Sequence, residues 1–157
     1  MSTKQDRLNR MDLLLLLLLA DGNKGTNEPI EGKTRLQKQL FLSQKKLKDH
    51  KIDKAYSFRP YYYGPYCKEI YSDIDLLKKD GVLKEETKVD NYGGIVIVFS
   101  LTPQGISEVQ GMLESAAIRQ QYEIIRAIKK EFNSMSVVEL VDYTHEAYKD
   151  YATKSVV

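Results

Sequence analysis

Apolar and polar positions in the first part of the chain predict a buried helix followed by a loop. Eight consecutive apolar residues occupy positions 13–20, and polar residues flank them. A helix that is apolar all round is buried on nearly all sides, so we expect such a helix over residues 10–20. Residues 23–33 are rich in Gly, Pro and Asn, which predicts an exposed loop.

The second predicted helix covers residues 34–48, where leucines recur at helical spacing on one face. Thr34 is a suitable N-cap, because its hydroxyl can accept a hydrogen bond from the first turn. Lys38 and Lys45 are expected on the opposite, outward face.

The stretch over residues 59–83 is the one around which the rest of the chain is organised. Aromatic residues alternate loosely at 56–62, where this stretch begins, which predicts a short strand. Gly64-Pro65 predicts the start of a third helix, because the missing N–H of proline has no partner at the first helical position anyway. Gly81 is expected to end this helix as a left-handed cap.

The second half of the chain predicts a β-hairpin and then helices. Two strand candidates, at 82–89 and 95–101, flank the turn sequence Asp-Asn-Tyr-Gly-Gly. The second strand is apolar on both faces, so we expect it to be the more buried. Thr102 opens a helical pattern that continues to about residue 132.

The last helix is expected to begin at a capping box formed by Ser136 and Glu139, and to end near residue 151.

This order of elements predicts the fold. Two helices, a short strand, a third helix and a two-stranded hairpin follow the order of a winged helix-turn-helix. The expected class is mainly α with a small β-hairpin (α+β), with additional C-terminal helices. The chain of 157 residues has the length of one domain. We expect a single winged-helix domain over 1–157, with its core at about 10–101 and C-terminal helices at about 103–151.

Two resemblances support this fold. The segment FSLTPQGISEV, a strand that runs through Leu-Thr-x-x-Gly into a helix, resembles the wing-to-helix junction of the MarR and PadR transcriptional regulators. A longer set of segments, GKTRLQKQLFLS, FRPYYYGPYCKEIYSDIDLLKKDGVL and the tail with Tyr148, Tyr151 and Thr153-Lys154-Ser155, resembles the Panacea (SocA-like) antitoxin domain family and its uncharacterised relatives.

In that family a Lys-Leu-Gln-Lys-like segment is followed by Gly-Pro at the start of the next helix. The matching positions here are Arg35-Leu36-Gln37-Lys38 and Gly64-Pro65. The resemblance implies a non-enzymatic module that binds partner proteins or DNA, with no catalytic residues to carry over.

Charge is nearly balanced over the whole chain but uneven along it. The formal net charge is +2, whereas residues 31–60 hold nine basic and three acidic residues. A basic segment on a near-neutral protein suits a nucleic-acid face, and it equally suits a solvated helix end and loop.

A DNA-binding transcriptional regulator is the first function that the sequence favours. The third helix would enter the major groove, but Glu69, Asp73 and Asp75 balance its three lysines, and acids beside phosphates weaken binding. The residues expected to contact double-stranded DNA are Lys33, Arg35, Lys38, Lys45, Lys68, Ser72, Lys79 and Lys88.

A protein-interaction module of antitoxin or adaptor type is the alternative. Tyrosines anchor many protein interfaces and also stack on bases. They equally fill space between helices, with the hydroxyl in water. Because alternate residues of a strand face opposite sides, we expect roughly two or three exposed tyrosines here. The expected partner-binding residues are Tyr61, Tyr62, Tyr63 and Tyr71.

The sequence predicts no enzyme, cofactor or metal site. Gly32-Lys33-Thr34 matches the end of a phosphate-binding P-loop, but Asn27 occupies the position of its first glycine. His50 and His145 have no ligand at metal-site spacing. Cys67 falls on the inward face of the third helix and is expected to be a core thiol.

Location and assembly are the remaining expectations. The apolar run is far shorter than the ~20 residues that span a bilayer, and no small-x-small cleavage site follows it. We therefore expect a cytoplasmic protein without a membrane partner. The apolar pattern over residues 106–128 suits a homodimer through the C-terminal helices, and equally suits packing on the first helix.

Overall fold

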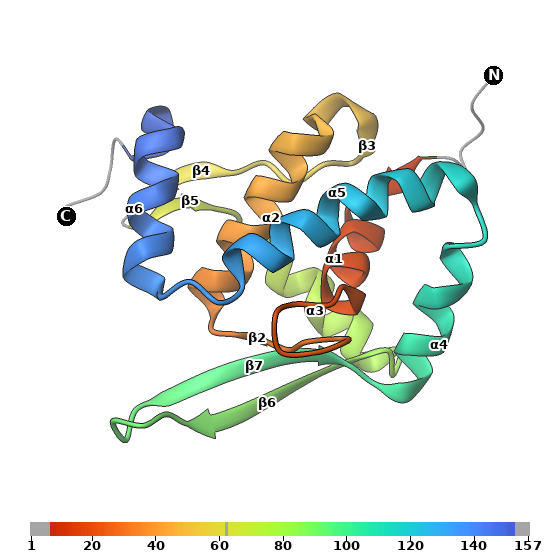
Figure 1. Ribbon diagram of the computed structural model, residues 1–157, viewed down its shortest axis with the longest axis horizontal. Coiled ribbons are helices and arrows are strands. Elements are labelled where there is room, and N and C mark those ends of the chain that lie inside the picture. The colour runs from red at the N-terminus through yellow and green to blue at the C-terminus, as the bar shows by residue number, and fades with distance from the viewer. Residues whose placement is uncertain (1–6, 62, 153–157) are drawn as a thin grey trace.

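Six α-helices and three small sheets are found among the residues that the computed structural model describes, 7–61 and 63–152 (Figure 1). Helices account for 56% and strands for 18%, so the α+β class is confirmed. Tyr62 and the tail segment Thr153-Lys154-Ser155 lie outside the described residues.

The largest sheet is antiparallel and has the strand order β2-β7-β6, formed by β2 (Ile30–Glu31), β7 (Ile95–Leu101) and β6 (Leu83–Val89). A second, two-stranded sheet joins β1 (Leu8–Asn9) in parallel to β3 (Ile52–Asp53). Strand β2 lies within the segment predicted to be an exposed loop. That prediction was wrong there, because the two residues of β2 pair with β7, the central strand of the sheet, and Ile30 is buried.

Helix α1 (Arg10–Leu19) is the buried helix that the leucine run predicts. The side chain of Asn9 accepts a hydrogen bond from the backbone N–H of Asp12, and the Asp12 carboxylate accepts one in return from the Asn9 N–H. Helices α4 and α5, together with β7, lie against α1, and all of its leucines except the half-buried Leu15 are buried.

Helix α2 (Lys33–Leu47) also forms where predicted, and η2 (Asp49–Lys51) follows it. Two details differ from the prediction. Gly32, rather than Thr34, is the N-cap residue. Because glycine has no side chain, no side-chain hydrogen bond from this position caps the helix. Lys38 does not point outward but is buried, because α5, α6 and β5 (Gly64–Tyr66) all lie against α2.

Gly64-Pro65 does not begin a helix, which corrects the prediction for this dipeptide. It belongs to β5, which pairs antiparallel with β4 (Arg59–Tyr61), and α3 (Glu69–Lys79) begins only after it. Tertiary contacts explain the extended backbone. The side-chain amide of Gln37 donates to the carbonyl oxygen of Cys67 at 2.8 Å and accepts from its N–H at 2.9 Å. The end of α3 is as predicted, since Gly81 has φ of +77°.

The hairpin of β6 and β7 is confirmed and extends well beyond the helical body (Figure 1). Strand β7 is more buried than β6, as expected, and its burial is graded along the strand. Phe99 is buried and pairs with Ile30 of β2, whereas Ile95 near the tip is 76% exposed. The body covers only the end of the hairpin next to α4.

The C-terminal part consists of α4 (Pro103–Met112), α5 (Ala116–Phe132), α6 (Val137–Ala147) and η3 (Lys149–Ala152). The Thr102 cap and the Ser136–Glu139 capping box are confirmed. The pattern predicted as one helix to residue 132 is instead two helices, because the chain turns after Met112 and Ser115 caps α5.

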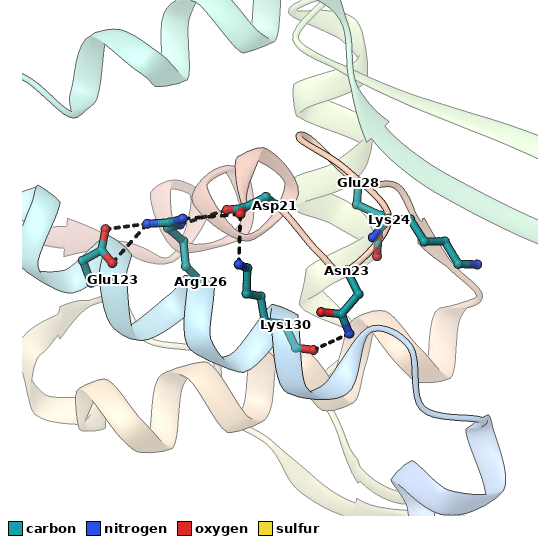
Figure 2. Close-up of polar contacts among 7 residues, drawn as sticks. All are labelled: Asp21, Asn23, Lys24, Glu28, Glu123, Arg126 and Lys130. Carbon is teal, nitrogen blue, oxygen red and sulfur yellow. Dashed lines mark hydrogen bonds and ion pairs between the residues drawn. The ribbon is translucent and has the colours of Figure 1, made fainter.

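The loop between α1 and β2 is fastened to α5 by polar contacts (Figure 2). Asp21 accepts from Arg126 Nε at 2.9 Å and lies 3.6 Å from Lys130 Nζ, and Arg126 also contacts Glu123. The hydrogen bonds from Arg126 lower the pKa of Asp21 to about 2. Asn23 donates to the backbone carbonyl of Lys130. These contacts hold α5 against the N-terminal half.

Within the described ranges, no helix has both the length and the apolar character to cross a bilayer.

Candidate functional site

Five of the residues singled out from the sequence gather at one pocket of about 210 Å³. It lies where the first half of α2 meets the β4–β5 hairpin and the start of α3. In Figure 1 this hairpin runs between α2 and α6. The five residues, Lys33, Lys38, Tyr61, Tyr63 and Tyr71, are joined at the pocket by Thr34, Gln37, Gly64 and Tyr66. We call it the tyrosine pocket.

Lys38 is the most unusual residue of the tyrosine pocket, because its side chain is 2% exposed. Its ammonium group donates one hydrogen bond, to the carbonyl oxygen of Pro65 at 3.2 Å. No carboxylate among the described residues lies within ion-pair distance of it. Burial lowers the pKa of Lys38 to about 8, so the group is still mainly charged at pH 7.

Gly64 makes room for Lys38 and for His145 of α6. A Cβ placed on Gly64 would lie 3.3 Å from Lys38 Cε and 3.4 Å from His145 Nε2. The φ of Gly64 is +102°, a backbone conformation that other residues rarely adopt. Nε2 of His145 is buried and has no hydrogen-bond partner among the described residues. Two polar side chains therefore meet on the open side of this glycine.

The wall of the tyrosine pocket formed by Gln37 is rigid. Its amide makes both hydrogen bonds to the Cys67 backbone, which fixes the chain between β5 and α3. The Cys67 thiol is buried, as predicted for a core thiol, and burial raises its pKa. A thiol in this state is a poor nucleophile.

Tyrosine rings form the other walls and the rim. Tyr61 stacks on Tyr66 with ring centroids 4.7 Å apart, and Tyr66 lies 6.3 Å from Tyr71. Tyr61 and Tyr63 are 46% and 57% exposed. Lys33 holds its ammonium 5.0 Å from the centre of the Tyr71 ring, a cation–π distance. The rim therefore offers large aromatic surfaces whose positions are set by ring–ring contacts.

The basic residues of α2 do not form the row of phosphate contacts that the sequence predicts. Lys38 is buried, and Arg35 donates to the backbone carbonyls of Glu31 and Met135. Lys45 pairs with Asp49 at 2.9 Å and lies over the ring of Phe41. Of the four residues of α2 predicted to contact DNA, only Lys33 is exposed.

The remaining DNA candidates lie on α3 and the hairpin. Lys68, Ser72 and Lys79 are exposed as predicted. Lys88 of β6 is exposed and pairs with Glu31 at 2.7 Å. Tyr62 is outside the described residues.

The charge balance predicted for α3 needs one correction. Asp73 points into the core, where it accepts from Arg10 at 2.9 Å and from the hydroxyl of Tyr56 at 2.7 Å. The outward face of α3 therefore carries one acid fewer than the sequence suggested.

Sequence reasoning missed Gly64, which lines the tyrosine pocket, and His145, which lies beside Gly64. The first was assigned to a helix start, and the second is far from the other residues in sequence. Nothing in the local pattern around His145 indicates that α6 returns to β5.

Other hollows have less coherent linings. One of about 310 Å³ mixes Lys24 and Arg35 with Glu28 and Glu31, so it favours neither charge. Within the described residues, no group of three or more His, Cys, Asp or Glu side chains is arranged to hold a metal. No protein-family model matches the chain, and no curated protein matches it at a significant level.

Proposed function

We propose that this protein is a non-enzymatic binding protein of the winged-helix type, and that it docks a protein partner through the tyrosine pocket. The observation that carries the proposal is the gathering of four tyrosines and Lys38 at one preformed hollow. It corresponds to an interaction module of antitoxin or adaptor type, as the resemblance to the Panacea family implies.

The winged-helix assignment is supported by the order of elements. Helix α1 is followed by β2, α2, α3 and the β6–β7 hairpin, and β2 joins the hairpin in one sheet. The β4–β5 hairpin is an addition between α2 and α3. This insertion supplies Tyr61, Tyr63 and Tyr66, so the proposed docking surface is built on the part that departs from the plain order.

A protein partner is favoured by the chemistry of the rim. Tyrosine is enriched among residues whose truncation costs interfaces the most, because it buries a large ring and keeps a polar hydroxyl. Tyr61 is already held by its stack on Tyr66, so docking orders little additional side-chain freedom.

The docking proposal is tested with peptides selected from a random displayed library against the purified protein. We expect Tyr63→Ala to weaken the selected peptides by roughly tenfold or more, without loss of stability, because this side chain is mostly exposed. Tyr92→Ala is the matched control: it removes a tyrosine at the far tip of the hairpin and should leave affinity unchanged. Peptides that bind Tyr63→Ala as well as they bind the native protein would refute docking at this pocket.

DNA binding remains the second candidate, and one observation favours it. Helix α3 exposes Lys68, Ser72 and Lys79, and the β6–β7 hairpin projects beyond the body as a wing would. The burial of Lys38 removes one of the DNA contacts expected from α2.

The DNA candidate is tested by binding to random duplex DNA at low and moderate salt. Phosphate contacts require affinity to fall as salt rises, and Lys79→Glu should weaken binding to all sequences more than Lys46→Glu on α2. Binding that is absent, or insensitive to salt, excludes this function.

A homodimer through the C-terminal helices is tested by sedimentation of the same sample. If the dimer forms, the measured mass depends on protein concentration.

A further inference from the structure

We propose that the tyrosine pocket recognises a carboxylate, supplied by the C-terminus or by an acidic side chain of the docked segment, and that Lys38 Nζ binds it. The inference rests on the proposed docking function and names the chemical group that the partner must present. Three features of the pocket argue for an anion, and a fourth argues for a carboxylate.

The first feature is an uncompensated buried cation. An ammonium group has three N–H donors, and Lys38 uses one of them, on the carbonyl oxygen of Pro65. The described residues that line the pocket include two lysines and no acid. Buried charges in proteins are normally paired, and no described carboxylate pairs with this one. An anion that enters the pocket could accept hydrogen bonds from the other two N–H donors of Lys38 and balance its charge.

The second feature is the positive end of α2. This helix has 15 residues, its first turn contains no acid, and no side chain caps its N-terminus. Its first two residues, Lys33 and Thr34, line the pocket. The free N–H groups and the helix dipole favour an anion at such an end. They act in the same direction as the charge of Lys38.

The third feature is an unpaired polar atom. Nε2 of His145 is buried without a hydrogen-bond partner among the described residues. It lies 3.4 Å from the position that a Cβ on Gly64 would take, and Lys38 Cε lies 3.3 Å from the same position. An imidazole N–H at this position can donate to an oxygen that reaches Lys38, and a buried group left without a partner is costly.

The shape of the pocket favours a carboxylate over a backbone phosphate of nucleic acid. Lys38 is 2% exposed, so only the end of a chain or of a side chain can reach it. A phosphate within a nucleic acid is flanked by sugars on both sides. A carboxylate ends its group, and the tyrosine rings can pack against the apolar atoms that carry it.

The test uses two probes that differ in one group, N-acetyl-phenylalanine and its amide. Their binding is followed by NMR signals of the pocket tyrosines and of Lys38. We expect the acid to bind at least roughly tenfold more tightly than the amide, because a charge-assisted hydrogen bond is lost in the amide. Inorganic phosphate and adenosine monophosphate, tested as competitors, should displace the acid poorly.

Lys38→Met removes the charge and keeps the length of the side chain, so it should abolish the preference for the acid. Lys46→Met, on the exposed side of the same helix, is the matched control and should keep it.

A pH titration of the native protein provides a second measurement that needs no variant. Affinity for the acid should fall as pH rises through about 8, where Lys38 loses its proton. Among the described residues, the other titratable groups that line the pocket or lie beside Gly64 are Lys33, the four tyrosines and His145. His145→Gln should keep the fall in affinity, whereas Lys38→Met should remove it.

Several outcomes overturn the inference. Equal binding of acid and amide, no binding of the acid, or stronger binding of either phosphate competitor would each exclude carboxylate recognition. Docking through the tyrosines would still stand if the selected peptides lose affinity for Tyr63→Ala. If that loss is also absent, the proposed function fails as well.

Discussion

Two of the lysines that the structure describes are buried, and their surroundings differ in an instructive way. Lys38 and Lys129 each donate one hydrogen bond to a backbone carbonyl oxygen, of Pro65 and of Leu18, both at 3.2 Å. Burial lowers the pKa of Lys38 to about 8 and that of Lys129 to about 7.

The acids around the two lysines distinguish them. The carboxylates of Glu28 and Asp21 favour the charged form of Lys129 and partly offset its burial. Lys129 joins α5 to the end of α1 and is 0% exposed. Lys38 has no such acid, and it lines an open pocket. A buried lysine with acids around it fastens helices together, whereas one without them at a pocket is a candidate for binding an anion.

Replacing each lysine by glutamate should give the largest difference between the two sites in the free energy of unfolding. Lys129→Glu places a third carboxylate beside Glu28 and Asp21 in the core, and we expect a loss of at least about 3 kcal/mol in the free energy of unfolding. Lys38→Glu should cost less, because water can enter the open pocket. Urea denaturation measures both. Equal losses would show that the two sites are equally enclosed.

Replacing either lysine by a neutral residue should change how the free energy of unfolding depends on pH, and the two changes should cover different pH ranges. The effect should be smaller than that of charge reversal. The folded pKa of Lys129 lies below its unfolded value of 10.5, so the unfolded state binds more protons between about 7 and 10.5. The free energy of unfolding therefore rises with pH through this window because of Lys129. Below the window, the folded protein bears the full cost of burying the charged lysine. Lys129→Met should lose this rise.

Lys38→Met should lose a rise confined to the narrower window above about 8. Unfolding free energies at several pH values test both, with Lys46→Met as the exposed control. If the free energy of unfolding of Lys129→Met still rises with pH between about 7 and 10.5, groups other than Lys129 cause the rise.

The smallest expected effect concerns the glycine that admits Lys38. Gly64→Ala strains a backbone with positive φ, at a cost of about 1–3 kcal/mol, and also crowds Lys38 and His145. Gly93→Ala has a similar φ of +80° with nothing within 4 Å of the new Cβ, so it measures the strain alone. Thermal or urea unfolding should show the greater loss for Gly64→Ala. If the two losses are equal, the space beside Gly64 is not needed.

The elements that sequence reasoning placed correctly depend on contacts within a few residues. The leucine run, the Asp90–Gly94 turn region, the Thr102 cap and the Ser136–Glu139 capping box all act locally. The helix break before Ser115 was missed, because apolar spacing alone continues through it.

The sequence analysis selected part of the lining of the tyrosine pocket, but it assigned the lysines to DNA contacts and the tyrosines to a protein partner. Tyrosines and lysines near α2 and α3 were selected from composition and spacing, and five of them do line one pocket. Their arrangement depends on Gln37, whose side chain makes two hydrogen bonds to the Cys67 backbone between β5 and α3. These bonds join residues 30 positions apart, and no local pattern reports them.

The sequence by itself therefore determined the helices, the long hairpin and the residue types available for binding, because propensity, capping and apolar period act over short distances. Only the tertiary structure decided that Lys38 is buried, that Asp73 faces Arg10, and that His145 returns to Gly64. These facts depend on how α2 lies against α5, α6 and β5, and long-range packing of that kind sets burial and charge balance independently of local pattern.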